Sequence, residues 1–425
     1  MTFSLARGIK RMFAGASRLL MMQPRNQEER NIRLLYLNTA MVGVAAGGIM
    51  AFLPVFLARL GANSTMISWL TSGPALVAVF FLIPGAIIAE HHANHVQVRV
   101  TWVSVVLLGY LLCALAPFVV PIAYLPIVLI FLWTFKVLAE AVTIPAWTAV
   151  MARAVSPQRR PQLNGTRWAL MSLVMAVSSA FFGWLLDRVT FPFNYQLVFF
   201  ISFAVAVLDP LFFAQIKIPP NEVLRQPSGI GLQRRVQDYF KPIFSHKPFV
   251  TYLLSTVVYR IALNLPVPLL TLFWVNELKA PDTLIGLRGT VGYSALVVGY
   301  MLWGRYANRL GHRKVLFIST LGLALYPFLT GLIPSAIWML PVALLWGLTA
   351  AGIDVALFDM MLGAVGQERQ PLFAAFWGIE ANLCVFIGPL LGAALSNAVG
   401  LRTALLIGGL LQVVATLPFL RLPRD

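Results

Sequence analysis

Apolar residues are grouped along this chain in twelve runs, separated by short polar stretches. A helix needs about 20 mostly apolar residues to cross the hydrocarbon core of a bilayer, and each run is long enough to do so. The pattern therefore predicts twelve membrane-spanning helices. They are expected near residues 33–58, 66–88, 99–120, 122–149, 167–187, 194–215, 249–274, 284–304, 315–333, 336–362, 372–397 and 401–420.

The composition supports this assignment. Hydrophobic residues make up 59% of the 425 residues and charged residues 11%, whereas soluble domains usually carry about 25% charged residues. Too little polar surface is present to cover a water-soluble globule, and disordered, collagen-like and disulfide-rich chains are excluded as well. Cys113 and Cys384 both lie in apolar runs and indicate no redox compartment. We expect an all-α membrane protein.

The net charge of +17 follows the predicted topology. Because the number of spans is even, both ends of the chain are expected on one side of the membrane. Lysine and arginine are several times more frequent in the segments on that side than on the other, a bias that marks the cytoplasmic side. We therefore expect a cell (inner) membrane protein with both termini in the cytoplasm. The positive charge is assigned to topology and not to nucleic-acid binding.

Two polar segments organise the chain. Residues 1–31 place apolar and basic side chains at helical spacing and lack a signal-peptide core, which predicts either a basic amphipathic helix on the membrane surface or an irregular tail. Residues 216–247 contain proline and glycine breaks and separate six spans from six. The expected domains are a cytoplasmic leader (1–31), a six-helix bundle (32–215), a cytoplasmic linker (216–247) and a second bundle (248–425).

The two halves share short sequence matches. Thr65–Ser68 aligns with Thr283–Gly286, and Val155–Pro161 aligns with Val365–Pro371, at equivalent loops of each half. Internal repeats of this kind are common in transporters. The sequence therefore predicts a duplicated six-helix bundle.

One loop carries a recognisable motif. Residues 304–314 read GRYANRLGHRK and lie between the second and third spans of the second half. They resemble the G-x-x-x-D-R-x-G-R-R/K-K signature of the major facilitator superfamily, with Asn308 in place of aspartate and His312 in place of an arginine. The copy in the first half, around Glu90, is degenerate. The resemblance in architecture covers residues 32–425 and implies a secondary transporter whose two six-helix bundles open a midplane site alternately to each face. The signature names no substrate.

The same loop is a candidate gate. Gly304 and Gly311 allow two helices to turn closely, and Arg309 and Arg313 can reach carbonyl or carboxylate groups at neighbouring helix ends. We predict a latch that holds the cytoplasmic side closed and that is weaker than usual in the family, because Asn308 carries no charge. The alternative is that both arginines serve only membrane topology.

Charged side chains inside the predicted spans are candidates for function, because a charge at mid-bilayer costs about 2.5–3.5 kcal/mol on insertion scales. The resemblance implies that spans 1, 4, 7 and 10 line the central cavity, and three of these four spans contain a charge. The candidate substrate-binding or ion-coupling residues are Lys136, Glu140 and Trp147 in span 4, Tyr259 and Arg260 in span 7, Asp354 in span 10, and Trp377 and Glu380 in span 11.

Structural roles remain open for several charged residues. Lys136 and Glu140 are four residues apart and can neutralise each other along one helix. Arg260 can serve as a counter-ion for Asp354 or Glu380 across the interface between the halves. Two further acidic residues are given structural roles here: Asp359 is expected to pair with a loop arginine, and Asp209, which precedes Pro210, to cap a helix restart.

The deepest charges do not balance, since two cations stand against three carboxylates. A buried carboxylate without a cation binds a proton more readily, because loss of water disfavours its charged form. Glu140 has Lys136 one turn away, and Asp354 lies nearer the cytoplasmic end, where water can enter. We therefore expect Glu380 to be the proton-binding group.

These features predict a secondary active transporter for a small organic solute, working by alternating access and coupled to protons or another ion. Export of an amphipathic compound is favoured, because the candidate walls are aromatic (Trp147, Tyr252, Tyr259 and Trp377). The alternatives are uptake of a polar solute such as a sugar or organic acid, with Lys136 and Arg260 as anion binders, and a non-transporting sensor or scaffold.

Other classes of activity lack support in the sequence. We find no nucleophile–base pair, no metal-ligand cluster inside the spans and no phosphate-binding loop of the ATPase type. We therefore expect no enzyme activity, no cofactor and no metal. The expected partners are a small-molecule substrate, a coupling ion and membrane lipids, and the chain is expected to be a monomer.

Overall fold

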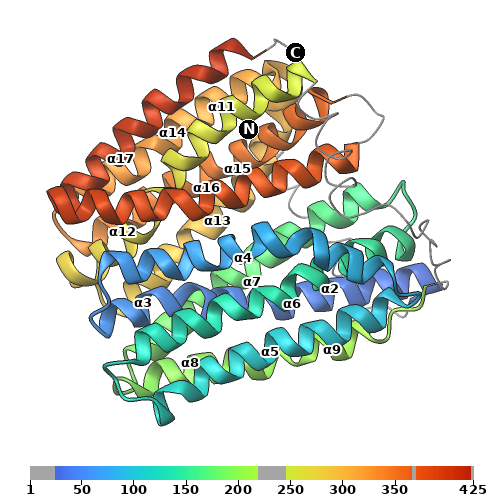
Figure 1. Ribbon diagram of the computed structural model, residues 1–425, viewed down its shortest axis with the longest axis horizontal. Coiled ribbons are helices and arrows are strands. Elements are labelled where there is room, and N and C mark those ends of the chain that lie inside the picture. The colour runs from blue at the N-terminus through green and yellow to red at the C-terminus, as the bar shows by residue number, and fades with distance from the viewer. Residues whose placement is uncertain (1–23, 219–245, 366–369, 423–425) are drawn as a thin grey trace. The chain divides into compact units, whose positions relative to one another are not determined.

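The computed structural model describes residues 24–218, 246–365 and 370–422. All regular structure in these ranges is helical (Figure 1), and twelve helical stretches there are long and apolar enough to cross a membrane. The twelve predicted spans are thus confirmed. Most of the leader 1–31 and of the linker 216–247 falls in residues 1–23 and 219–245, outside the described ranges.

The first six spans contain nine helical elements. Span 1 is formed by α2 (Gln27–Ala45), η1 (Ala46–Met50) and α3 (Ala51–Arg59). Spans 2 to 5 are α4 (Ser64–Glu90), α5 (His95–Val119), α6 (Leu125–Ala154) and α7 (Arg160–Leu186), and span 6 is divided into α8 (Phe193–Ala206) and α9 (Leu208–Phe213).

The last six spans follow the same plan. Span 7 consists of α11 (Lys247–Asn264), α12 (Val267–Leu272) and η2 (Phe273–Glu277). Spans 8 and 9 are α13 (Asp282–Leu310) and α14 (His312–Leu332), span 10 is η3 (Ala336–Trp338) with α15 (Met339–Gly363), span 11 is α16 (Gln370–Val399), and span 12 is α17 (Leu401–Thr416) with η4 (Leu417–Arg421).

The π-helical turn η1 in span 1 is explained by its contact with span 6. A Cβ atom on Gly48 would lie 2.1 Å from the Ser202 Oγ atom, so only glycine allows this approach. The Ser202 hydroxyl accepts a hydrogen bond from the Ile49 amide at 3.2 Å. Because a π-turn frees backbone amides from the regular helical ladder, this external acceptor stabilises the irregular turn.

The tight turn that the motif predicts between spans 8 and 9 is present. Gly311 has a φ angle of 81°, in the left-handed region that glycine adopts without strain. It is the only residue between the end of α13 at Leu310 and the start of α14 at His312.

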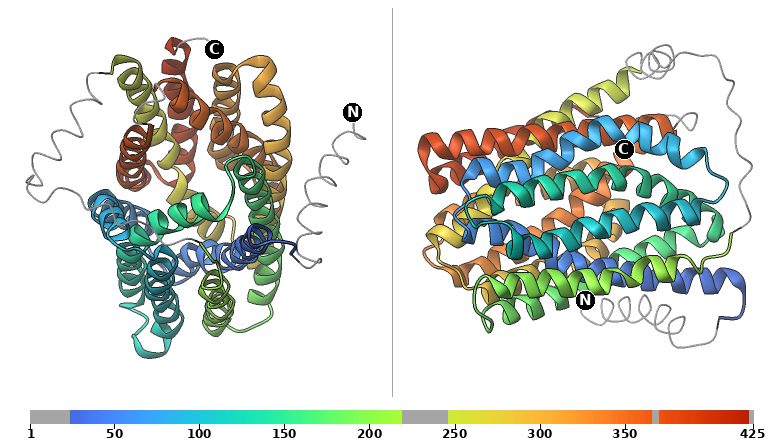
Figure 2. Two further views of the ribbon diagram at one scale, coloured as in Figure 1. Left: turned by 90° about the vertical axis from the view of Figure 1, so that its right-hand side faces the viewer. Right: turned by 60° about the horizontal axis from the view of Figure 1, so that its bottom comes forward.

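The chain forms two compact units, each of which takes the beginning of one helix from the other half of the sequence. Unit 1 comprises Met1–Phe56, Phe80–Leu224 and Pro281–Ser294, and unit 2 comprises Leu57–Val79, Arg225–Ala280 and Ala295–Asp425. Unit 1 therefore contains the start of α13, and unit 2 the start of α4. Within unit 1 α5 packs on α6 and α8, and within unit 2 α14 packs on α15 and α17 (Figures 1 and 2).

One apolar core of unit 1 joins spans 1, 4, 5 and 6 near the end where α2 begins. Leu35, Val150, Leu163 and Phe213 are at most 2% exposed there, and Trp147 packs against this cluster while remaining half-buried. The core fixes the helices that carry the polar groups described next.

Candidate transport site

Lys136 and Glu140 form the first of the predicted pairs, on α6. The Lys136 Nζ atom lies 2.5 Å from the Glu140 Oε1 atom, and Lys136 is buried. The ammonium group also lies 4.2 Å from the centroid of the Trp133 ring, a cation–π contact. The interpretation that these two residues neutralise each other along one helix is therefore confirmed, and Lys136 is already engaged by a carboxylate.

Arg260 and Glu380 form a second pair, between α11 and α16. The Arg260 Nη1 atom is 3.4 Å from the Glu380 Oε2 atom, and the two side chains are 11% and 7% exposed. The guanidinium also lies 4.5 Å from the centroid of the Trp377 ring. The predicted counter-ion role of Arg260 is confirmed for Glu380. Both residues belong to unit 2, so the expectation that the pair would bridge the two halves was wrong.

This pair overturns the premise that Glu380 lacks a protein cation. Besides Arg260, its carboxylate accepts a hydrogen bond from the Cys384 thiol, with a distance of 3.4 Å between Sγ and Oε1. Position in the sequence could not show this, because Arg260 and Glu380 come from helices far apart along the chain. The candidate carboxylate without a cation beside it is therefore not Glu380.

Asp354 is that carboxylate. It lies on α15, about 14 Å from the C-terminal end of the helix at a rise of 1.5 Å per residue, and it is exposed. Its Oδ2 atom accepts a hydrogen bond of 2.7 Å from the Tyr300 hydroxyl of α13. Within the described part of the chain Asp354 forms no ion pair, in contrast to Glu140 and Glu380.

The two tyrosines of α11 are packed inside unit 2. The Tyr252 hydroxyl donates a hydrogen bond of 2.8 Å to the Leu357 carbonyl oxygen of α15, and Tyr252 is 1% exposed. Tyr259 is fully buried, and its ring centroid lies 5.4 Å from that of Phe419. Both therefore contribute to packing. Trp147 and Trp377, the other two aromatic candidates, are half-buried, and each lies beneath an arginine.

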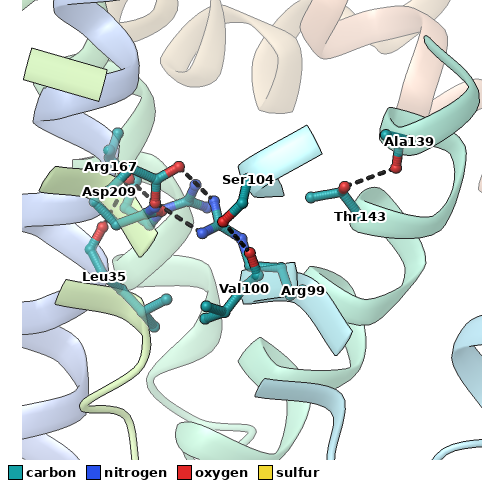
Figure 3. Close-up of polar contacts among 10 residues, drawn as sticks. Leu35, Arg99, Val100, Ser104, Ala139, Thr143, Arg167 and Asp209 are labelled. Carbon is teal, nitrogen blue, oxygen red and sulfur yellow. Dashed lines mark hydrogen bonds and ion pairs between the residues drawn. The ribbon is translucent and has the colours of Figure 1, made fainter. Parts of the chain in front are cut away.

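Sequence reasoning missed an ion pair in unit 1. Arg99 and Asp209 are buried and form two parallel hydrogen bonds of 2.8 Å each (Figure 3). Asn38 donates a further hydrogen bond to the same carboxylate. The helix restart before Pro210 is present, but Asp209 does not cap it: Val207 occupies the cap position of α9, and the Asp209 side chain is directed to Arg99. The interpretation of Asp209 as a helix cap was wrong.

Arg167 was also missed as an intramembrane residue. It lies about 10 Å inside α7 at a rise of 1.5 Å per residue. Its Nε atom donates a hydrogen bond of 2.8 Å to Thr39 Oγ1, and its guanidinium carbon lies 4.2 Å from the centroid of the Trp147 ring. The apolar run of span 5 begins at this residue, so its position in the sequence does not mark it as intramembrane.

The motif loop is held within unit 2. Arg313 donates a hydrogen bond to the Leu420 carbonyl oxygen of η4. His312 Nδ1 lies 3.4 Å from the Asp359 carboxylate, so the partner that the structure shows for Asp359 is the histidine that replaces a motif arginine. Arg309 and Gly304 are exposed, and the side chain of Asn308 lies outside the described set.

The sequence matches the family model of the Major Facilitator Superfamily over residues 35–259 and 252–425. The chain belongs to this superfamily. The two matches cover one half of the chain each, in agreement with the predicted duplication. The protein is accordingly an integral membrane transporter of a small molecule and not an enzyme.

Solved structures of superfamily transporters have the same fold. The nucleoside transporter NupG is 12% identical, with a TM-score of 0.69 over 93% of this chain and 99% of its own. A bacterial homolog of the human lysosomal transporter Spinster is 14% identical, with a TM-score of 0.70 over 93% and 97%. A POT family transporter in complex with 5-aminolevulinic acid is 12% identical, with a TM-score of 0.73 over 92% and 95%. No curated protein sequence matches the chain.

No group of three or more potential metal ligands occurs among the residues described by the structure. Arg167 in unit 1 and Asp354 in unit 2 are charged side chains inside spans for which the described part of the chain shows no ion pair.

Proposed function

We propose that the protein is a proton-coupled secondary transporter of a small amphipathic organic solute, and that Asp354 is the group that binds the coupling proton. One observation carries this proposal. Asp354 lies inside a span, is exposed, and has only the Tyr300 hydroxyl as its hydrogen-bond partner among the described residues.

An unpaired carboxylate at this depth is unfavourable in contact with lipid, where a buried aspartate costs several kcal/mol. Asp354 would avoid most of this cost if it faced a water-filled transport path and took up a proton when that path closed. Proton uptake makes the carboxyl group neutral, and its release restores the charge. Substrate binding that favours one of these two forms would couple the solute to the proton.

Contacts between spans from the two sequence halves support an alternating-access mechanism. In unit 1 the Ser179 hydroxyl of α7 donates to the Gly286 carbonyl oxygen of α13 at 3.1 Å. In unit 2 the Ser68 hydroxyl of α4 donates to the Pro389 carbonyl oxygen of α16 at 2.8 Å. Single hydrogen bonds of this kind have a small net free energy, about 1 kcal/mol, so they can break and form again during a transport cycle.

From the distribution of basic residues we expect both termini in the cytoplasm. From the half-buried tryptophans we expect export of the solute.

Uptake of an organic acid is the second candidate function, and Arg167 is the observation that favours it. Lys136 and Arg260, the anion binders expected from the sequence, are engaged by carboxylates, whereas Arg167 has only uncharged partners among the described residues.

The experiment uses the full chain in proteoliposomes. A thermal-shift screen first identifies a stabilising compound, which is then followed in radiolabelled form. The proposal predicts counterflow exchange, together with accumulation that depends on an imposed pH gradient and is abolished by a protonophore. The sign of the effective gradient gives the direction of transport. Binding without counterflow would indicate a sensor or scaffold, and accumulation that ignores the pH gradient would exclude proton coupling.

A further inference from the structure

The guanidinium of Arg167 differs in its partners from two other cations inside the spans of unit 1, Lys136 and Arg99. Lys136 lies 2.5 Å from a carboxylate oxygen, and Arg99 lies 2.8 Å from one. Among the described residues, the contacts of Arg167 are with the Thr39 hydroxyl, through Nε, and with the face of Trp147. Within the described ranges, no carboxylate pairs with it.

The neighbouring groups cannot supply the missing negative charge. Asp209 already accepts two hydrogen bonds from Arg99 and one from Asn38 (Figure 3). The Thr39 hydroxyl donates its own hydrogen to the Leu35 carbonyl oxygen at 2.8 Å. Arg99 and Asp209 neutralise each other, so neither of them supplies a counter-charge to Arg167.

The arrangement is accessible as well as charged. Arg167 and Trp147 are both half-buried, and both Thr39 and the Trp147 ring contact the guanidinium. Its two terminal Nη groups have no hydrogen-bond acceptor among the described residues. A guanidinium with both Nη groups available binds a carboxylate or phosphate group through two parallel hydrogen bonds. The indole beside it offers an apolar face to the rest of such a molecule.

We infer that Arg167, Trp147 and Thr39 form an anion-binding site, and that the transported solute is a small organic anion with an apolar or aromatic body. This inference rests on the proposed transport function and specifies its substrate class. The residues come from three helices, α7, α6 and α2, that are held together by the apolar core of unit 1. The site is therefore formed by packed helices and not by a loop.

The test measures binding to the full chain in nanodiscs of phosphatidylcholine, which carry no anionic lipid. Four probes of similar size are compared: benzoate, phenyl phosphate, benzamide and benzylamine. We expect benzoate or phenyl phosphate to raise the thermal unfolding temperature in a saturable manner, and the uncharged and cationic probes to have no effect. The stronger of the two anions identifies the headgroup as carboxylate or phosphate.

Variants connect the response to this arginine. Because hydrogen bonds to charged groups are stronger than those between neutral groups, Arg167→Gln should weaken anion binding about tenfold or more. Arg167→Lys should retain part of the affinity, because the charge remains. Arg159→Gln is the matched control, since it removes the same charge from a largely exposed site at the start of the same helix. A comparable loss of affinity in this control would overturn the assignment.

Other results would also contradict the inference. Equal responses to benzoate and benzamide would show that the charge is not recognised. A response to phosphatidylglycerol in the nanodisc with none to the soluble probes would assign the site to a lipid headgroup. Binding is measured without a gradient, so it tests the anion site independently of the transport proposal. Anions that bind without being transported would contradict transport and not the anion site. Transport that is unaffected by Arg167→Gln would contradict the role of the site and not transport itself.

Discussion

At the scale of single residues, Arg99 and Asp209 form a buried ion pair in unit 1. Two hydrogen bonds of 2.8 Å join them, both side chains are 5% exposed, and the guanidinium also lies 4.1 Å from the centroid of the Phe213 ring. Such a pair is a poor guide to net stability, because desolvation offsets attraction. Removal of one partner, however, strongly lowers the free energy of unfolding, because the remaining charge stays buried without a counter-ion.

Asp209→Asn is therefore expected to destabilise the protein by about 3–5 kcal/mol, measured as a lower midpoint of thermal unfolding in detergent. The double variant Arg99→Met with Asp209→Leu removes both charges and should recover much of the lost stability. If the double variant is less stable than Asp209→Asn alone, the pair itself is stabilising and this interpretation is wrong.

The contrast between two ion pairs shows what the sequence can predict at this scale. Lys136 and Glu140 lie on one helix four residues apart, so their pairing follows from helical geometry. Arg99 and Asp209 are separated by 110 positions, and each lies near the end of its apolar run. Hydrophobic periodicity carries no information about which helices are neighbours, so this pair and the partner of Glu380 required the structure.

At the scale of secondary-structure elements, the start of α13 depends on a side chain from α7. Asp187 follows the last residue of α7, and its carboxylate accepts hydrogen bonds from the Asp282 amide at 3.0 Å and the Thr283 amide at 2.8 Å. These amides belong to the first turn of α13, where backbone N–H groups have no carbonyl acceptor within their own helix. Asp187 thus performs the role of a helix cap from another span.

Asp187→Ala should weaken this first turn by about 1 kcal/mol, the usual contribution of a cap, so that the Asp282 and Thr283 amides exchange with solvent deuterium about fivefold faster. Asp187→Asn keeps an oxygen acceptor and should change exchange less. Exchange at these two amides that is the same in Asp187→Ala as in the wild type would show that the hydrogen bonds contribute nothing in the membrane.

The motif loop belongs to the same scale. We propose that Arg313 anchors the motif loop within unit 2, because it reaches the Leu420 carbonyl oxygen, and that Arg309 contributes less, because it is exposed. Arg313→Ala should increase labelling of a cysteine placed at Leu422, which is 3% exposed, whereas Arg309→Ala should leave labelling unchanged. Increased labelling in Arg309→Ala but not in Arg313→Ala would show that Arg309, and not Arg313, holds the loop in place.

For the whole molecule, the distribution of basic residues predicts the orientation. A cysteine at Ile122, in the exposed turn between α5 and α6, should react with an impermeant maleimide from outside intact cells. One at Gln158, between α6 and α7, should react only after permeabilisation. Cys113 and Cys384 are buried and should give little background. Labelling of Gln158→Cys but not Ile122→Cys in intact cells would reverse the orientation.

The twelve spans, the duplication and the superfamily could be predicted because they depend on local features: the length of apolar runs, short repeated stretches and one loop motif. The proton-binding residue could not be predicted in this way, because it depends on which carboxylate has no cation beside it once the helices are packed. The sequence favours Glu380, because Glu140 has Lys136 one turn away and Asp354 lies nearer the cytoplasmic end. The contact between Glu380 and Arg260 favours Asp354 instead.

The most direct measurement compares two activities of the Asp354→Asn variant in proteoliposomes: counterflow exchange of the labelled solute, and its accumulation driven by a pH gradient. Asparagine is close in size to aspartate but takes up no proton, so exchange should persist while accumulation falls to the level seen with a protonophore. Glu277→Gln, at a surface residue that pairs with Arg402, is the matched control and should retain both activities. Accumulation by Asp354→Asn equal to that of the wild-type protein would contradict proton coupling through this carboxylate.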